Sequence, residues 1–214
     1  MSASMMQERK SGPALARPPQ TARPEVQPVL SFAPDETIFR EGGEARWMYK
    51  LVDGLVRGCR FHADGRRQIE VFHKPGDVFG FEPGLEYGLS AEAVTACTVL
   101  RLARPDLARD PHAAVRLCGY AMRALAAAQA HARLLGRGSA GQRLAGFLLD
   151  LQAEPRQELM ELPMTRQDIA DYLGLTIETI SRTLGQFVRQ GMLHLVTARK
   201  LRILDREGLA ALCG

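Results

Sequence analysis

The segment from Pro163 to Gly191 constrains the fold more than any other, because it reads as two short helices joined by a tight turn. Thr165 can cap the first helix with Asp168 as its capping-box partner, and Gly174 suits the turn. Thr176 can cap the second helix. At about 100° per residue its apolar residues form one stripe: Ile177, Ile180, Leu184, Phe187 and Val188. The pattern predicts a helix–turn–helix with one packed face and one exposed face.

The exposed face of the second predicted helix carries Glu178, Ser181 and Arg182 near its start. Arginine can donate two hydrogen bonds to guanine, glutamate can accept one from the cytosine amino group, and a hydroxyl can approach thymine. A helix–turn–helix presents the N-terminal residues of its second helix to the major groove in this way. The alternative is a surface ion pair between Glu178 and Arg182, worth roughly 0.2–0.5 kcal/mol.

The stretch LGLTIETISRTLGQFVRQGML, which begins at Leu173, resembles the helix–turn–helix of the Crp/Fnr family of bacterial transcription regulators. Its ETISR core is similar to the Fnr-type branch; the cyclic-AMP receptor branch has Arg in place of Ile177 and Gly in place of Ser181. The resemblance implies that Glu178, Ser181 and Arg182 read bases. It extends from about Val29 to Leu212 and is nearest to the FixK subgroup.

The whole chain is expected to be α+β, with four segments. Residues 1–28 contain five prolines and no apolar periodicity, which predicts a disordered tail. In residues 29–108, turn pairs such as Asp53-Gly54 and Asp64-Gly65 recur every 10–12 residues or so, as in a compact β unit. By resemblance this unit is the family's β-roll, related to cyclic-nucleotide-binding domains. Residues 109–136 form the dimerisation helix, and residues 137–214 form the winged helix–turn–helix domain.

A long helix is predicted around residues 110–136, with apolar or small residues three and four apart, as in a coiled-coil seam. The seam consists of Val115, Cys118, Met122, Leu125, Gln129 and Ala132. A second apolar stripe runs beside it, and one stripe is enough to pack the helix on its own domain. The other therefore predicts a homodimer, and the family's dimer helix lies at this position.

Contacts with the DNA backbone are expected around the base-reading helix. Residues 192–205 read as a β-hairpin with Arg199 and Lys200 near its tip, which suits a phosphate-binding wing. Thr165, Thr176 and Arg189 are the other candidates for backbone contacts. By resemblance, the loops 152–161 and 61–66 are candidates for contact with RNA polymerase.

Cofactors of the related regulators are not expected here. Residues 1–28 hold no cysteine, and an iron–sulfur cluster needs thiolate ligands. Residues 75–100 hold no Lys or Arg, and Leu89 stands where the cyclic-AMP branch has its phosphate-binding arginine. A buried phosphate needs a charged partner, so we expect no cyclic nucleotide. Haem remains an alternative, because one axial ligand suffices.

Enzyme activity is not expected, since no nucleophile, base and orienting group are recognisable together and His62 and His73 lack metal-ligand spacing. The four cysteines form no CxxC motif, and neither a membrane span nor a signal peptide is recognisable. We therefore expect a cytoplasmic protein. Cys59, between Arg57 and Arg60, is the candidate redox thiol, because positive charge activates thiols.

These features predict a transcription regulator, by resemblance an activator of genes for low-oxygen respiration or nitrogen fixation that binds palindromes of the Fnr-type half-site TTGAT. One alternative within the family is a haem-dependent regulator of nitric-oxide or denitrification genes. An alternative from another class is a small-ligand-binding β-roll whose C-terminal helices contact proteins.

Overall fold

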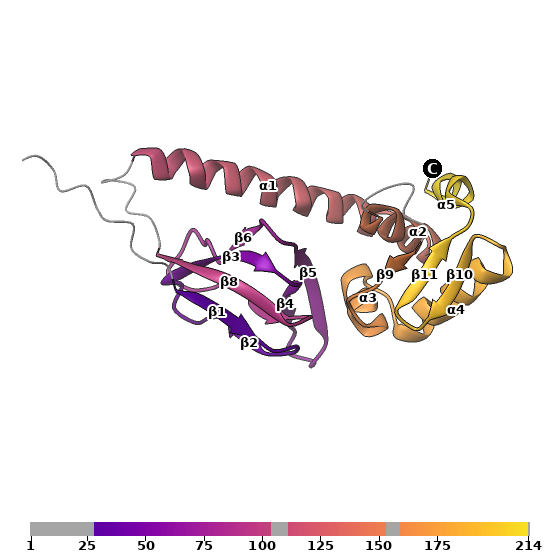
Figure 1. Cartoon of the computed structure of the whole chain (residues 1–214), viewed down its shortest axis with the longest axis horizontal. Coiled ribbons are helices and arrows are strands. Elements are labelled where there is room, and N and C mark those ends of the chain that lie inside the picture. Colours follow the sequence, from indigo (N-terminus) through magenta and orange to yellow (C-terminus); the bar gives the residue numbers. More distant parts are fainter. Residues whose placement is uncertain (1–27, 104–110, 153–158, 214) are drawn as a thin grey trace, which may run out of the picture.

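The structure, a computed structural model, describes residues 28–103, 111–152 and 159–213. Figure 1 shows a β-roll, one long helix above it, and a smaller domain of helices with a short sheet. The long helix leads from the β-roll to the smaller domain, and the two domains lie next to each other along it. This is the α+β architecture that the sequence predicts. The predicted tail lies outside the described residues apart from Pro28.

The described part of the β-roll contains two four-stranded antiparallel sheets. The first has the order β1 (Val29–Phe32), β8 (Cys97–Ala103), β3 (Trp47–Asp53) and β6 (Val78–Phe79). The second has the order β2 (Thr37–Phe39), β7 (Ser90–Ala93), β4 (Val56–Phe61) and β5 (Arg67–His73). Leu51 and Val99 of the first sheet pack in one core with Val56 and Ala91 of the second.

Two of the predicted turn pairs connect neighbouring strands. Asp53-Gly54 lies between β3 and β4, and Asp64-Gly65 lies between β4 and β5. Gly54 has a φ of 91°, and a Cβ atom there would come within 2.5 Å of the Ala96 carbonyl oxygen. Only glycine fits this close approach, which explains why the turn signal is visible in the sequence.

Helix α1 (Pro111–Leu135) is about 38 Å long at the standard rise of about 1.5 Å per residue. Near its C-terminal end, His131 and Leu134 are buried against the neighbouring domains. Its middle is exposed, including every member of the predicted seam: Val115, Cys118, Met122, Leu125, Gln129 and Ala132. Met122 and Leu125 remain 59% and 51% exposed, so a single chain leaves an apolar stripe uncovered.

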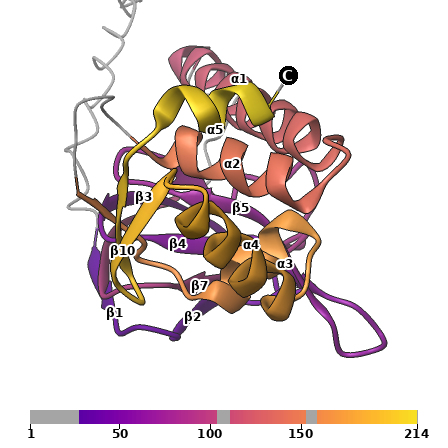
Figure 2. The same ribbon diagram turned by 90° about the vertical axis from the view of Figure 1, so that its right-hand side faces the viewer.

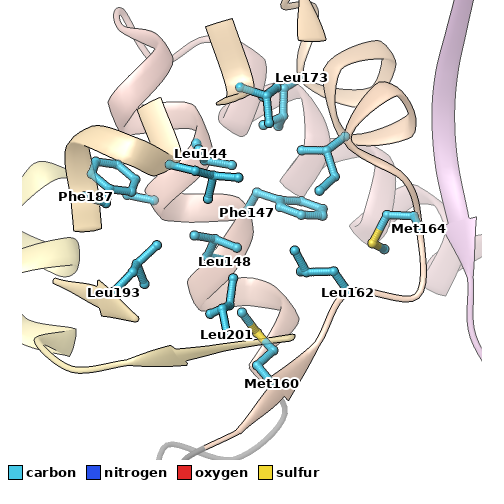
Figure 3. Close-up of a cluster of buried hydrophobic side chains, with 14 of the residues drawn as sticks. Leu144, Phe147, Leu148, Met160, Leu162, Met164, Leu173, Phe187, Leu193 and Leu201 are labelled. Atoms are coloured by element: carbon cyan, nitrogen blue, oxygen red, sulfur yellow. The ribbon is translucent and has the colours of Figure 1, made fainter. Parts of the chain in front are cut away.

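The C-terminal domain packs four helices on a three-stranded sheet of order β10–β11–β9. Its helices are α2 (Ala140–Leu151), α3 (Arg166–Leu173), α4 (Ile177–Arg189) and α5 (Arg206–Leu212). Its strands are β9 (Met160–Glu161), β10 (Leu193–Thr197) and β11 (Lys200–Ile203). Figure 3 shows their apolar side chains meeting in one core, with Leu148 near the middle. Figure 2 shows α3 and α4 on the side of this domain that faces away from α1.

Candidate DNA-binding surface

The caps predicted for the helix–turn–helix are present. The Thr165 hydroxyl accepts a hydrogen bond from the Asp168 backbone N–H at 3.0 Å, and the Asp168 carboxylate accepts one from the Thr165 N–H at 3.0 Å. Gly174 ends α3 with a φ of 61°, the left-handed region that favours glycine. Thr176 then caps α4 by accepting from the Thr179 N–H at 3.3 Å. Local hydrogen bonds therefore set where both helices begin and where the turn lies.

Helix α4 packs by a narrower arc than the sequence predicts. Ile180, Leu184 and Phe187 are fully buried, whereas Ile177 and Val188 are each 37% exposed, so their predicted burial is wrong. The buried arc is shifted toward Thr183, whose hydroxyl donates to the Thr179 carbonyl at 2.8 Å. This hydroxyl needs no external partner, which allows a polar residue to face the core.

The opposite face of α4 carries the predicted base readers. Glu178 and Arg182 are exposed and Ser181 is half-buried. Glu178 and Arg182, both within the described residues, form no ion pair with each other. Arg182 instead donates a long hydrogen bond of 3.4 Å to the Thr179 hydroxyl. Its guanidinium is therefore free to bind an external acceptor, and the surface ion-pair alternative loses its support.

The sequence did not single out Arg166, the first residue of α3. Its guanidinium donates to the Ser181 hydroxyl at 3.3 Å and so lies beside the base-reading face.

The pKa of Glu178 is lowered by a hydrogen bond from the backbone N–H of Glu178 itself and by one from the Thr176 side chain. Glu178 is therefore a carboxylate at neutral pH and can only accept hydrogen bonds, as the cytosine amino group requires.

Known proteins match this chain over nearly its whole length. Residues 142–212 match the model of the Crp-like helix-turn-helix domain, and residues 29–109 match that of the cyclic nucleotide-binding domain. The nitrogen fixation regulation protein FixK of Azorhizobium caulinodans is 42% identical over 207 residues, which cover 92% of this chain and 83% of that protein. The chain belongs to the Crp/Fnr family of transcription regulators.

Two further relatives support the same placement within the family. The regulator is 39% identical to the FixK of Rhizobium meliloti over 86% of this chain and 87% of that protein. The solved structure of FixK2 from Bradyrhizobium japonicum matches with a TM-score of 0.81 and 40% identity, over 88% of this chain and 98% of that one. These relatives are transcription regulators and not enzymes, which confirms the expectation that the chain has no enzymatic activity.

The wing of the regulator is the β10–β11 hairpin. Arg199 is exposed in the hairpin turn, Lys200 is half-buried at the start of β11, and Arg202 is exposed two residues further along β11. β11 also pairs with β9, which anchors the wing to the domain core. Arg189 is exposed at the end of α4. Thr165 and Thr176 are exposed but use their hydroxyls as helix caps, so a phosphate would have to share them.

A cleft of about 250 Å³ lies between α1 and the β-roll. Its lining includes Leu89, the residue expected in place of the phosphate-binding arginine, and the acidic residues Asp77 and Glu82. It also includes Arg123 from α1, which lies outside the cation-free stretch 75–100. Arg123 lies over the ring of Tyr120, 5.1 Å from its centroid. The cleft is therefore mainly apolar and rich in aromatic rings, with two acidic residues and one guanidinium in its lining.

His73 lies in the same cleft. Its ring stacks on Phe79 with the centroids 4.7 Å apart, and desolvation lowers the pKa of His73 to about 4. His62 is exposed at the β4–β5 turn. Within residues 28–103, 111–152 and 159–213, no three His, Cys, Asp or Glu side chains gather as metal ligands would.

Cys59 proves a poor candidate for a redox thiol. It is fully buried, and desolvation, with the nearby Glu92, raises the pKa of the thiol to about 12. The charges of Arg67 and Arg57 lower the pKa of the Cys59 thiol, but they do not offset its burial, and Arg57 is itself paired with carboxylates. The expectation that flanking arginines activate Cys59 is therefore wrong, because burial outweighs their charge.

The candidate polymerase loops differ in what the structure describes. Residues 153–158 of the first lie outside the described residues. The second, residues 61–66, forms the tip of the β4–β5 hairpin and borders a cleft shared with α3 and the start of α4. Among the described residues, no helix is long and apolar enough to cross a membrane.

Proposed function

We propose that this regulator binds as a homodimer to palindromes of the half-site TTGAT, acting in the cytoplasm mainly as an activator. Its targets are genes for low-oxygen respiration or nitrogen fixation. The observation that carries the proposal is the outer face of α4, on which Glu178, Ser181 and Arg182 lie together near the helix N-terminus. Their donors and acceptors match the guanine, cytosine and thymine edges of that half-site.

The homodimer follows from the exposed stripe of α1. A methionine and a leucine more than half exposed on one helix face are costly in water unless a partner covers them. A second copy of α1 supplies the same stripe, and two-fold symmetry matches the symmetry of a palindrome. The dimer also sets the spacing of the two recognition helices.

DNA binding is proposed to need neither cyclic nucleotide nor iron–sulfur cluster. The α1 cleft, at about 250 Å³, is smaller than the ~300–1,000 Å³ common for ligand pockets, and its lining contains one arginine and two acidic residues. The cysteines are dispersed: Cys59 and Cys97 are buried in different sheets, Cys118 is on α1, and Cys213 follows α5. Such an arrangement offers no common cluster site.

Activation is proposed to use contacts with RNA polymerase through the loops 61–66 and 152–161. The FixK of Azorhizobium caulinodans is named as a nitrogen fixation regulation protein, and the 38% identical AadR of Rhodopseudomonas palustris as a transcriptional activatory protein. The first name supports a role in nitrogen fixation, and the second supports an activating role.

A gel shift tests the proposed function. Protein purified in air should shift a TTGAT palindrome as a dimer, and neither cyclic AMP nor anaerobic iron–sulfur reconstitution should be required. An absorption spectrum of the same sample should show no Soret band, which separates this proposal from a haem-dependent regulator. Binding that appears only after one of these additions contradicts the effector-free part of the proposal.

A further inference from the structure

We infer that Arg57 and Arg67 of the β-roll are positioning residues for DNA recognition, because they hold the first helix of the helix–turn–helix in one orientation. This inference rests on the proposed function and adds to it the part of the β-roll that DNA binding requires. It assigns a task to a cluster of buried charges that lies outside both the α1 cleft and the base-reading face.

The cluster joins the two domains through α3. Arg57 on β4 contacts the Asp168 carboxylate through Nη1 at 3.2 Å, and Arg67 on β5 contacts the same oxygen through Nη2 at 2.5 Å. Arg67 also contacts Asp171 through Nε at 2.7 Å. Asp168 is only 1% exposed, so its charge is shielded from water and depends on these partners.

The two arginines differ in their other partners. Within the β-roll, Arg57 contacts Glu92 at 2.8 Å and Asp35 at 3.0 Å, so it stays paired whatever α3 does. Arg67 has ion pairs in the described structure only with Asp168 and Asp171, both on α3. The ion pairs of Arg67 therefore exist only while the two domains are in contact.

Helical periodicity makes this contact a property of one face of α3. The face of α3 that meets the β-roll and α1 carries Asp168 and, three and four residues later, Asp171 and Tyr172. Figure 1 shows α3 beside β5. The Tyr172 ring stacks on His131 of α1 with the centroids 3.9 Å apart, and packs near Phe72 of β5 at 5.1 Å. Charge and aromatic contacts thus fix the same face.

The orientation of α3 determines that of the recognition helix. Ile169 and Leu173 of α3 share one buried core with Ile180 and Leu184 of α4, so the two helices move as a unit. The β-roll therefore orients α4 through α3, without itself touching a base.

Orientation matters for affinity because a palindrome must be met by two recognition helices at once, about one helical turn of DNA apart. If the ion pairs are lost and only a fraction of the chains hold α4 correctly, the apparent Kd rises by the inverse of that fraction. Discrimination between bases in a bound complex stays the same, since α4 itself is unchanged.

The test compares Arg67→Ala with Arg67→Lys, which keeps the positive charge beside Asp168 and Asp171. Arg60→Ala is the matched control, because Arg60 lies on the same hairpin but pairs with Glu41 and Glu70 of the β-roll. Each variant is titrated by fluorescence anisotropy against the TTGAT palindrome and a palindrome with its guanines replaced. Circular dichroism and light scattering confirm fold and oligomeric state.

We expect Arg67→Ala to weaken operator binding at least tenfold while preserving the ratio of affinities for the two palindromes. Arg67→Lys should retain most of the affinity that Arg67→Ala loses, and Arg60→Ala should bind as wild type does. Unchanged affinity in Arg67→Ala, or equal losses in Arg67→Ala and Arg60→Ala, would overturn the inference. Tighter binding in Arg67→Ala would overturn it too, because the ion pairs would then be inhibitory.

A second readout separates this inference from the proposed function. Spin labels at the exposed positions Val52 and Gln190 report the distance between the two domains in the absence of DNA. The labelled chains carry Ser in place of Cys118 and Cys213, and they are diluted with unlabelled chains. Arg67→Ala should broaden the distance distribution, whereas Arg67→Lys should keep it close to that of wild type. If wild type fails to bind TTGAT, the proposed function fails, and the inference still stands or falls on this distribution.

Discussion

Replacing Arg182 with Ala should abolish specific recognition of the half-site while leaving the fold and the dimer intact. Arg182 is exposed, and its single hydrogen bond among the described contacts is the 3.4 Å contact with Thr179. Removing such a surface side chain changes stability by no more than about 0.5 kcal/mol. Loss of one bidentate arginine–guanine contact costs about 1–3 kcal/mol, hence about 2–6 kcal/mol over two half-sites. At about 1.4 kcal/mol per factor of ten, binding weakens by about 30-fold to about 10⁴-fold.

The assay is fluorescence anisotropy with a TTGAT palindrome and a TTAAT palindrome at one fixed salt concentration, since phosphate contacts make affinity salt-dependent. Wild type should prefer TTGAT, whereas Arg182→Ala should bind the two sequences alike. Arg182→Lys, which keeps the charge but loses the planar fork, should keep non-specific affinity and lose most of the preference. An Arg182→Ala variant that binds TTGAT as tightly as wild type would refute the reasoning and make Arg182 a surface cation.

Three further predictions address the wing, the dimer helix and the buried carboxylate. Changing Arg199 and Lys200 together to Ala should weaken binding to all sequences alike and flatten its salt dependence; a loss confined to TTGAT in the same titrations would place the wing wrongly. Met122→Glu combined with Leu125→Glu should give a monomer by light scattering, because burying carboxylates in the dimer seam costs several kcal/mol. The same variant should no longer be cross-linked by a bismaleimide through the exposed Cys118. An intact dimer would show that the interface lies elsewhere. Desolvation alone would raise the pKa of Asp168, but hydrogen bonds from Thr165 and the charges of Arg57 and Arg67 lower it. The Asp168 carboxylate therefore stabilises the fold fully above the unfolded-state pKa of about 3.9. This stabilisation is lost as the pH falls through the lower pKa of the folded state. Asp168→Asn should therefore cost about 1–3 kcal/mol at pH 7, a difference that shrinks below about pH 4 in urea unfolding; a pH-independent difference would contradict the assignment.

The helix–turn–helix could be predicted from the sequence in detail because its determinants are local. Thr165, Asp168, Gly174 and Thr176 act on backbone groups within a few residues, so their spacing carries the structural information. The same holds for Gly54, whose turn permits no side chain. The burial of α4 is a weaker case: Ile180, Leu184 and Phe187 were placed correctly, but the packing that leaves Ile177 and Val188 exposed belongs to the tertiary structure.

Contacts between distant segments could not be predicted from one sequence. Cys59 looked activated because Arg57 and Arg60 flank it, yet Arg57 pairs with Asp168, 111 residues away, and burial governs the thiol. Arg123 was missed for a similar reason, since it lines the cleft from α1 and lies far along the chain from residues 75–100. Sequence neighbours are thus a poor guide to the charge around a buried group.

The central claim is that the α4 face of this regulator reads TTGAT without an effector. The most direct test is one anisotropy titration of wild-type protein, purified in air without added ligand, against TTGAT and guanine-substituted palindromes in the same buffer. With about 1–3 kcal/mol per guanine contact, the account predicts that the TTGAT palindrome binds at least about 30-fold more tightly. Equal affinity for the two palindromes would contradict it.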